Sequence, residues 1–424
     1  MWMGTHAGNP SYDYETKRSL EDFIKDNQAL MGNDVSKKYG EKLPFLFKVL
    51  SAQKALSIQA HPNKKLAKQL HEKNPKEYKD DNHKPEMTIA ITPFEGMCGF
   101  RPLKEISYFL KAVKPFRTLV GEEVASKFEA AVEDGSKSED ELKQALKETF
   151  SKLMNSKDED IKSASEELLA QVKKEDQSFA GGESTPTPGS KAFAELIPRL
   201  NGQFPGDIGL FVIFFLNVVN LQPGEAMFLR ADDIHAYISG GKSSCKPSIL
   251  NYSTKSNQPH HTDIMECMAS SDNVVRAGFT PKFKDVPTLT NMLTYNFAPI
   301  AEQKMSPADF PYCKFNTTAH SSDSTALLYD PPIEEFAVVK TDLNSAGSKV
   351  TFEAIDGPSI VICTEGQGTI SVGPKKEEMR EGWVYFVGAT AEVVLESTVA
   401  EEGKTFRTFR AFCEIAEEKP TGNL

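Results

Sequence analysis

The sequence is poor in cysteine, and its few cysteines lie far apart. Its 424 residues contain six, and no two of them form a C-x-x-C pair. This spacing excludes both a disulfide-stabilised secreted scaffold and a zinc site built from cysteine pairs. We therefore expect reduced, buried thiols in a cytoplasmic protein.

The sequence also lacks a surplus of positive charge and a long hydrophobic run. The net charge of -11 argues against nucleic acid as the main partner, because phosphate binding needs a basic surface. The first residues show no secretory signal pattern. The most apolar stretch, residues 210–219, is interrupted by Asn217 and is shorter than the roughly 20 residues of a membrane helix. We expect no membrane partner, while an anionic small substrate remains open.

The chain is longer than one hydrophobic core usually supports, so we expect two or three domains. Residues 104–176 are charged and rich in Ala and Leu, which predicts helices, and Ser138 with Glu141 forms a capping box before one of them. Short apolar runs between turn signals predict strands on both sides of this helical segment. These runs span residues 43–50, 56–61, 208–221, 226–229, 234–238, 359–363 and 383–387. The order β, helical insertion, β, β predicts jelly-roll barrels.

A small set of polar residues in the predicted strands suits a metal. Gln59 and His61 are two residues apart, so on a strand their side chains point to the same face. Glu86 and His235 follow later in the chain. Two imidazoles, a carboxylate and an amide oxygen suit zinc with an open position, although short motifs of this kind are unspecific on their own.

Five longer blocks occur in a fixed order along nearly the whole chain: residues 56–64, 82–87, 98–102, 223–226 and 271–278. They resemble the signature blocks of type I phosphomannose isomerases. The resemblance implies a mostly β fold with a helical insertion: two cupin-type jelly-roll barrels plus an α-helical domain. It implies a catalytic barrel from residues 1–103 and 204–318, a helical domain over 104–203, and a C-terminal cupin-like domain over 319–424. We expect that last domain to be metal-free, because it has no histidine after His320.

Carried onto this chain, the resemblance implies one Zn²⁺ held by Gln59, His61, Glu86 and His235. The family's catalytic arginine falls on Arg276, and its proposed proton carriers fall on Lys84 and Asp272. Ser57, with Lys48 or Lys64, would face the substrate phosphate. Glu266 stays open between a substrate-facing base and a half-buried strand residue.

The implied activity is the reversible isomerisation of mannose 6-phosphate and fructose 6-phosphate, which feeds GDP-mannose synthesis and glycosylation. A proton moves between C1 and C2 through a cis-enediolate, whose negative charge the guanidinium of Arg276 can stabilise. We expect a nearby metal to lower the pKa of Lys84, and burial to raise the pKa of Asp272. We further expect a monomer.

Two other functions compete with this interpretation. The chain could be a catalytically impaired cupin relic or gene-model variant that binds zinc or sugar phosphate without turnover. An oxygenase-like cupin is less favoured, because its metal site would not need Lys84 and Arg276.

The chain departs from the family pattern in two places. We expect the family's first strands to be missing, because the chain begins inside the block that contains Trp2 and His6. Those two residues either line the pocket or are frayed. Residues 241–262 are interposed, and we hypothesise that they are a retained intron.

Histidines at two other places in the sequence could be mistaken for zinc ligands. His260 and His261 lie in the interposed segment, which is polar, so we interpret them as part of a mobile loop and not as zinc ligands. For His83, a structural hydrogen bond is favoured over metal binding, because on a strand it faces away from Lys84.

Overall fold

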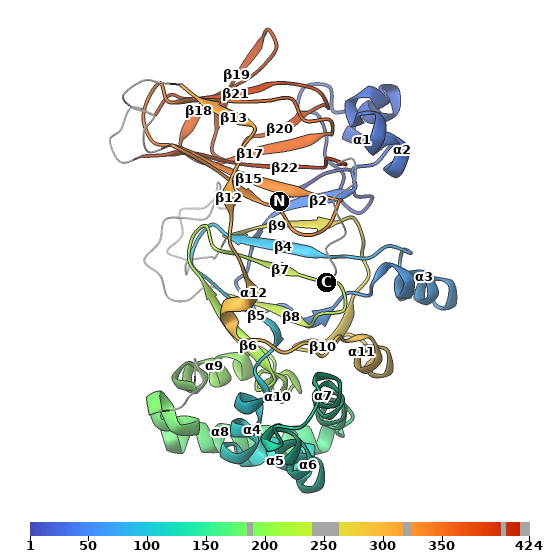
Figure 1. The fold of residues 1–424 in the computed structure, drawn as a ribbon, viewed down its shortest axis with the longest axis vertical. Coiled ribbons are helices and arrows are strands. Elements are labelled where there is room, and N and C mark those ends of the chain that lie inside the picture. Colours follow the sequence, from blue (N-terminus) through green and yellow to red (C-terminus); the bar gives the residue numbers. More distant parts are fainter. Residues whose placement is uncertain (185–189, 240–262, 317–323, 400–403, 416–424) are drawn as a thin grey trace.

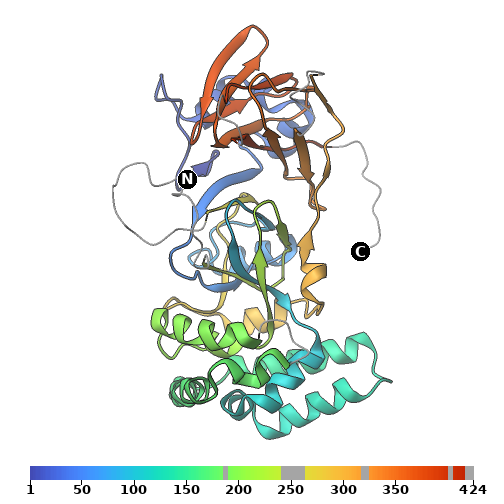
Figure 2. The same ribbon diagram turned by 90° about the vertical axis from the view of Figure 1, so that its left-hand side faces the viewer.

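The computed structural model describes residues 1–184, 190–239, 263–316, 324–399 and 404–415. A helical domain, a central β barrel and a C-terminal β barrel follow one another along the long axis (Figures 1 and 2). The predicted fold class, two barrels with a helical insertion, is confirmed. The interposed segment, with His260 and His261, lies outside the described residues.

The central barrel consists of two antiparallel sheets. In the first, the order is β1 (Trp2–Met3), β2 (Phe45–Ser51), β9 (Asp263–Ala269), β4 (Glu86–Ala90), β7 (Ala226–Leu229) and β11 (Lys304–Met305). In the second, the order is β10 (Val275–Gly278), β3 (Ile58–Ala60), β8 (His235–Ser239), β5 (Phe94–Phe100) and β6 (Leu216–Leu221). Strands distant in sequence are neighbours, so the site residues come from separate parts of the chain.

The alternation of side chains along β2 and β4 separates two environments. Phe47, Val49 and Met87 point out of the barrel and pack in the hydrophobic core that it shares with the C-terminal barrel. Lys48 lies between Phe47 and Val49 in the sequence, and Glu86 directly precedes Met87. Because side chains alternate along a strand, Lys48 and Glu86 point into the barrel. Both are buried, at 7% and 1% exposure. The polar interior of the barrel thus follows from the alternation of side chains between the two faces of each strand.

The helical domain covers the outer face of the second sheet. Its helices are α4 (Leu103–Ala112), α5 (Lys114–Val120), α6 (Glu122–Glu133), α7 (Glu139–Met154), α8 (Asp158–Glu175), η2 (Asp176–Ser184), α9 (Ser190–Gln203) and α10 (Gly209–Val212). The predicted capping box of Ser138 and Glu141 is present at the start of α7. Residues 208–221 were predicted as strand, but their first part forms α10 and only β6 is extended. An apolar run of this length carries no period that separates helix from strand.

The C-terminal barrel also has two antiparallel sheets. One has the order β12 (Ala308–Asp309), β14 (Thr325–Tyr329), β15 (Ala337–Leu343), β22 (Phe406–Phe412), β17 (Ser359–Glu365) and β20 (Val384–Val387). The other has the order β13 (Cys313–Phe315), β16 (Lys349–Phe352), β21 (Val393–Ser397), β18 (Gln367–Val372) and β19 (Lys375–Arg380). The interior of this barrel is mostly apolar.

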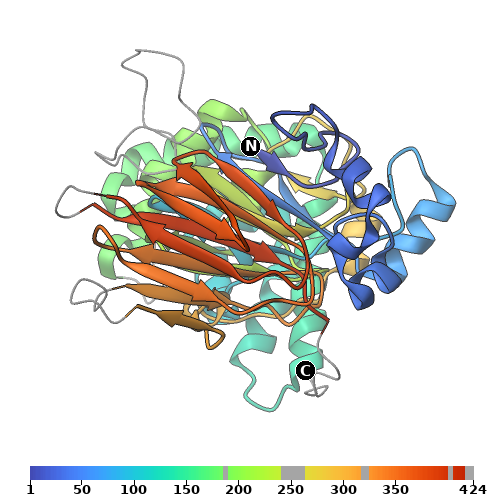
Figure 3. The same cartoon turned by 90° about the horizontal axis from the view of Figure 1, so that it is seen from above.

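Several short helices were not predicted from the sequence. They are α1 (Leu20–Asp26), η1 (Gln28–Met31), α2 (Asn33–Tyr39), α3 (Lys64–Lys73), α11 (Val286–Met292) and α12 (Ile300–Gln303). The first three lie beside the C-terminal barrel (Figure 3), where the amide of Ala389 donates to the carbonyl of Leu30. Among the described residues, every helix is too short or too polar to cross a membrane.

Candidate metal centre

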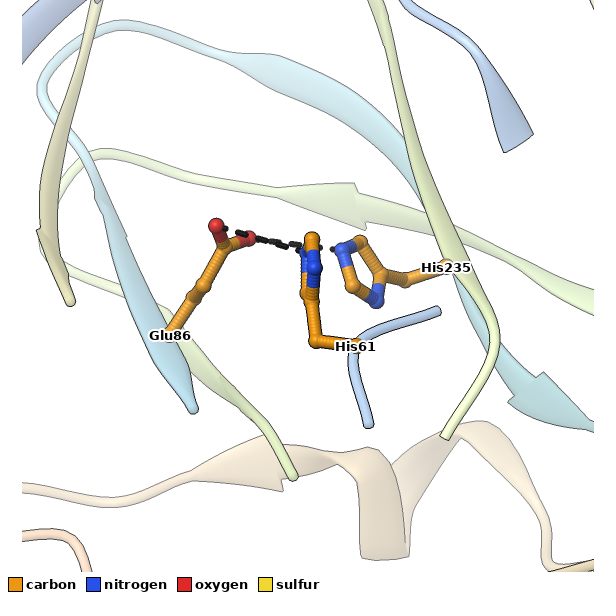
Figure 4. Close-up of side chains that lie close together, drawn as sticks. All are labelled: His61, Glu86 and His235. Atoms are coloured by element: carbon orange, nitrogen blue, oxygen red, sulfur yellow. Dashed lines mark ion pairs between the residues drawn. The ribbon is translucent and has the colours of Figure 1, made fainter. Parts of the chain in front are cut away.

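Three buried side chains, two from strands and one from the residue after a strand, converge inside the central barrel (Figure 4). Glu86 begins β4, His235 begins β8, and His61 directly follows β3. Glu86 Oε1 lies 3.5 Å from His61 Nε2, and Glu86 Oε2 lies 3.3 Å from His235 Nε2. In the described part of the chain, this is the one cluster of His, Cys, Asp and Glu that could hold a metal ion.

Both imidazoles are held so that the same nitrogen points to the centre. Nδ1 of His61 lies 2.6 Å from the backbone carbonyl of Asn273. Nδ1 of His235 lies 3.2 Å from the carbonyl of Asp233. A proton on each Nδ1 would fix the tautomer and leave Nε2 as a lone-pair donor, which is how ligand histidines are usually oriented.

The residues fit a metal ion, because their central atoms lack any other partner. Among the described residues, Nε2 of His61, Nε2 of His235 and Oε2 of Glu86 are buried and form no hydrogen bond. Buried polar atoms without a partner are rare and costly in native proteins. Three of them facing one point, as two nitrogens and one oxygen, form a donor set that zinc accepts.

Gln59 lies beside this cluster. In the register of the second sheet it is directly opposite His235 on one side and Arg276 on the other. Directly opposite residues point to the same face, so all three side chains face the barrel interior. Ser57 Oγ donates to Gln59 Oε1 at 3.1 Å, which places Ser57 at the same point.

The charges around the cluster favour the ligand forms of its side chains. Burial, assisted by the charge of Lys84, lowers the pKa of His61 to about 4, so its imidazole is neutral near pH 7. Burial alone would raise the pKa of Glu86. Lys84 and the two imidazoles outweigh it and hold the pKa of Glu86 well below its usual value, so this side chain is a carboxylate.

Lys84 is paired with the carboxylate of Glu86. Its Nζ lies 2.9 Å from Glu86 Oε1. Burial lowers the pKa of Lys84, but the carboxylates of Glu86 and Glu266 outweigh burial, and the pKa is raised. The expected lowering of this pKa by a bound metal stays a prediction.

Asp272 is not buried, contrary to the expectation from the sequence. Its side chain is 51% exposed in the loop between β9 and β10. Its carboxylate forms an ion pair with His6 Nε2 at 3.2 Å, and its amide donates to Asp80. Arg276, on the next strand, is half-buried and faces the interior.

A second pair of charged side chains lies inside the barrel. Lys48 Nζ lies 2.6 Å from Glu266 Oε2, and both side chains are buried. Glu266 is therefore buried and not half-buried, and its role as a base stays a prediction. The Trp2 ring lies 4.9 Å from Lys48 Nζ and 5.3 Å from the His6 ring, so these N-terminal residues are packed at the site and not frayed.

The remaining sequence-predicted residues lie further out, and two others were missed. Lys64 is exposed at the first position of α3. His83 hydrogen-bonds Glu335 of the C-terminal barrel, as the structural interpretation predicted. Asn273 and Tyr237 were missed. Tyr237 could have been found, because it lies two residues after His235 on the same strand and shares its face.

Family models match three parts of the chain. They are the catalytic domain of type I phosphomannose isomerase over residues 1–103, its helical insertion domain over 119–216 and its C-terminal domain over 326–375. The chain is 59% identical to the mannose-6-phosphate isomerase of Aspergillus fumigatus, over 100% of this chain and 89% of the relative. It is 45% identical to that of Saccharomyces cerevisiae, over 98% and 89%.

Solved structures agree with these sequence matches. A mannose 6-phosphate isomerase bound with zinc and yttrium superposes with a TM-score of 0.74 at 28% identity, covering 98% of this chain and 90% of that one. The apo form from Salmonella typhimurium gives the same TM-score, identity and coverage. The chain belongs to the type I phosphomannose isomerase family of aldose–ketose isomerases.

Proposed function

We propose that the chain interconverts mannose 6-phosphate and fructose 6-phosphate at a single Zn²⁺ held by Gln59, His61, Glu86 and His235. The observation that supports this most is the set of three buried, unpartnered donor atoms on the two histidines and Glu86. A relative named mannose-6-phosphate isomerase matches the whole chain, and a solved relative binds zinc. Bound here, Zn²⁺ supplies Lewis-acid stabilisation of negative charge on the substrate's oxygens.

Arg276 is the proposed stabiliser of the enediolate. It shares the interior face with Gln59 and His235, which brings a permanent positive charge beside the metal ligands. Removing the proton from one of these carbons leaves a negative charge on the enediolate oxygens, and a fixed cation lowers the energy of that state.

Lys84 and Asp272 are the proposed proton carriers. Lys84 contacts Glu86 and is close enough to Asp272 for their charges to interact. Asp272 is held by His6 and Asp80 while its carboxylate remains accessible. An accessible carboxylate can accept a carbon-bound proton and return it to the neighbouring carbon.

The proposed substrate-binding residues are Ser57, Lys48, Lys64 and Glu266. Ser57 touches the amide of Gln59, so a phosphate there would lie near the metal. Lys48 is already paired with Glu266 inside the barrel, whereas Lys64 is exposed at the start of α3 and free to meet a phosphate from solvent. Glu266 is suited to accept hydrogen bonds from sugar hydroxyls.

We also propose the division of the chain into residues 1–103 with 204–318, 104–203, and 319–424. Strand pairing favours one change to it. β11 pairs with the central barrel, whereas β12 and β13 pair with the C-terminal barrel. We therefore place that boundary between residues 305 and 308.

The test is formation of fructose 6-phosphate from mannose 6-phosphate by the purified full chain. We expect turnover that a zinc chelator abolishes and added Zn²⁺ restores, with one zinc per chain by elemental analysis. Stoichiometric zinc without turnover would support the relic that binds but does not react. Oxygen consumption would support an oxygenase-like cupin.

A pair of histidine variants separates ligand loss from general damage. His61→Ala should lose both zinc and turnover, because it removes a buried donor atom. His71→Ala is the matched control, since His71 lies on α3 and bonds only the carbonyl of Tyr78. It should keep zinc and turnover. A His61→Ala protein with full zinc would contradict the proposed ligand set.

A further inference from the structure

A buried side chain of the C-terminal barrel contacts the residue that precedes Lys84. Glu335 extends from the connection between β14 and β15, and its Oε1 lies 2.7 Å from His83 Nε2. Glu335 is 6% exposed, and the His83 side chain is 19% exposed. Burial raises the pKa of Glu335, but the hydrogen bond and charge of His83 outweigh burial and lower it. Glu335 is therefore a carboxylate when it meets the imidazole.

His83 precedes Lys84 in a segment outside the strands, whose last residue, Pro85, accepts a backbone hydrogen bond from Ala269 of β9. Residues 82–85 are irregular, and β4 begins only at Glu86. On one side the segment is attached to the central barrel, where Asn82 donates to the carbonyl of Ser270. On the other side, the Glu335–His83 hydrogen bond attaches it to the C-terminal barrel.

The two neighbouring side chains point in opposite directions. His83 points out to Glu335, and Lys84 points in to Glu86, where its Nζ lies 2.9 Å from Oε1. Because the two residues are adjacent, a hydrogen bond that holds the His83 side chain restricts the movement of the backbone from which Lys84 projects.

We propose that Glu335 is a positioning residue of the isomerase, which acts through His83 to hold Lys84 in its reactive place. The C-terminal barrel then contributes to catalysis through this contact, in addition to its packing role. This inference rests on the proposed function, because it assigns Lys84 a part in proton transfer. Misplacing a reacting group by about 1 Å can cost up to about a hundredfold in rate, so loss of this contact should be visible in turnover.

The experiment compares zinc-loaded Glu335→Ala, Glu335→Gln and Glu334→Gln with the unchanged chain. Glu335→Ala should lower kcat by about tenfold and change KM by less than about twofold, because substrate contacts remain and Lys84 is less well aimed. Glu335→Gln keeps an oxygen that can accept from His83 and should recover most of kcat. Glu334→Gln is the matched control: it alters a neighbouring ion pair, to Lys38 of α2, and should leave kcat unchanged.

A readout independent of turnover follows the position of Lys84. Its side chain is 10% exposed, so acetic anhydride should acetylate it slowly in the unchanged chain. The acetylation rate of Lys84, measured by mass spectrometry, should rise in Glu335→Ala and stay unchanged in Glu334→Gln. If Glu335→Ala does not fold, Glu335→Asp, whose carboxylate is one methylene shorter, should show both effects to a smaller degree.

The inference is overturned by an unaltered kcat in Glu335→Ala. It is also overturned if Glu335→Gln is as impaired as Glu335→Ala, or if the loss of rate matches a loss of zinc or of folded protein, because the residue would then be only structural. Absence of turnover in the unchanged, zinc-loaded chain would instead refute the proposed function. In that case the acetylation rate of Lys84 decides the positioning role.

Discussion

Buried charges at the site occur in matched pairs. Lys84 pairs with Glu86, and Lys48 pairs with Glu266, all with side-chain exposures of 10% or less. Removing one member of such a pair leaves the other charge uncompensated and usually costs about 3 to 5 kcal/mol. The pairs therefore balance the buried charges of a polar interior.

Arg276 should matter for turnover more than for metal binding. Replacing it with Met removes the cation that faces the interior beside Gln59. We expect kcat to fall by about a hundredfold, since loss of one oxyanion donor typically has this effect. Steady-state kinetics and zinc content are the measurements. Arg117→Met, in the helical domain, is the control and should keep normal turnover. An Arg276→Met protein with normal kcat would refute the role.

Arg410 carries a buried charge without an ion pair in the described part of the chain. Its Nε donates to Ser359 at 3.0 Å, while Nη1 has no hydrogen-bond partner. Burial lowers the pKa of Arg410 to about 10. Replacing it with Met should raise the free energy of unfolding by about 1 kcal/mol, because an unsatisfied buried polar group is removed. Urea unfolding is the measurement.

Arg407, on the same strand, provides the contrast to Arg410. It forms ion pairs with Asp342 at 2.6 Å and Glu365 at 2.7 Å. Arg407→Met should therefore lower the free energy of unfolding by about 1 kcal/mol. If Arg410→Met were the more damaging of the two, the guanidinium of Arg410 would have a stabilising role that its contacts do not explain.

The site was predictable from the sequence to the extent that local spacing determines it. The Q-x-H pattern places Gln59 and His61 close together, and family resemblance adds Glu86 and His235. Burial was not predictable. Asp272 is exposed because it lies in a loop, and Glu266 is buried because Lys48 pairs with it from a strand over two hundred residues away. Such partners depend on topology and not on neighbouring residues.

At the scale of single elements, the periodic segments were predicted best. The capping box and the apolar face of α7 give two independent signals, and both are present in the structure. The prediction failed for short helices such as α1 and α2, whose stability comes from packing on the C-terminal barrel and not from their own period. It failed also at α10, within an apolar run buried on all sides.

Helix α7 should show a defined acid sensitivity at its start. Contacts with Lys137 and with Ser138 lower the pKa of Glu141 to about 2. The folded pKa is below the unfolded one, near 4.5, so the stabilisation is complete above pH 4.5. It is lost as the pH falls from 4.5 toward 2. Glu141→Gln should therefore be less stable than the unchanged chain at pH 6, and the difference should shrink below pH 4.5.

Thermal unfolding at several pH values measures this difference. Glu148→Gln is a suitable control, because Glu148 lies on an exposed part of the same helix and has only a glutamine as hydrogen-bond partner. A difference between Glu141→Gln and the unchanged chain that stays constant from pH 6 to pH 3 would contradict the assignment.

At the scale of the whole molecule, the hydrophobic cores extend across the domain boundaries. One cluster joins the helical domain to the second sheet of the central barrel, with Phe116 and Ile58 in the same core. Another joins the central barrel to the C-terminal barrel, with Phe47 and Phe409 in the same core. The sequence pattern shows which residues are apolar but not which face meets which partner, so this arrangement could not be predicted from composition and period.

The shared cores predict that the three domains unfold together. Chains of this size often unfold in several steps, because each domain has its own core. Here Phe409 is 1% exposed at the boundary between the barrels, and Phe409→Ala should cost about 3 to 5 kcal/mol. Because its core includes strands of both barrels, calorimetry of the zinc-loaded chain should show one transition that moves as a whole.

Tyr312→Ala, at a side chain 58% exposed, should leave that transition nearly unmoved. Two transitions, with only one shifted by Phe409→Ala, would mean that each barrel is stable alone, and Glu335 would then act across an interface that can open.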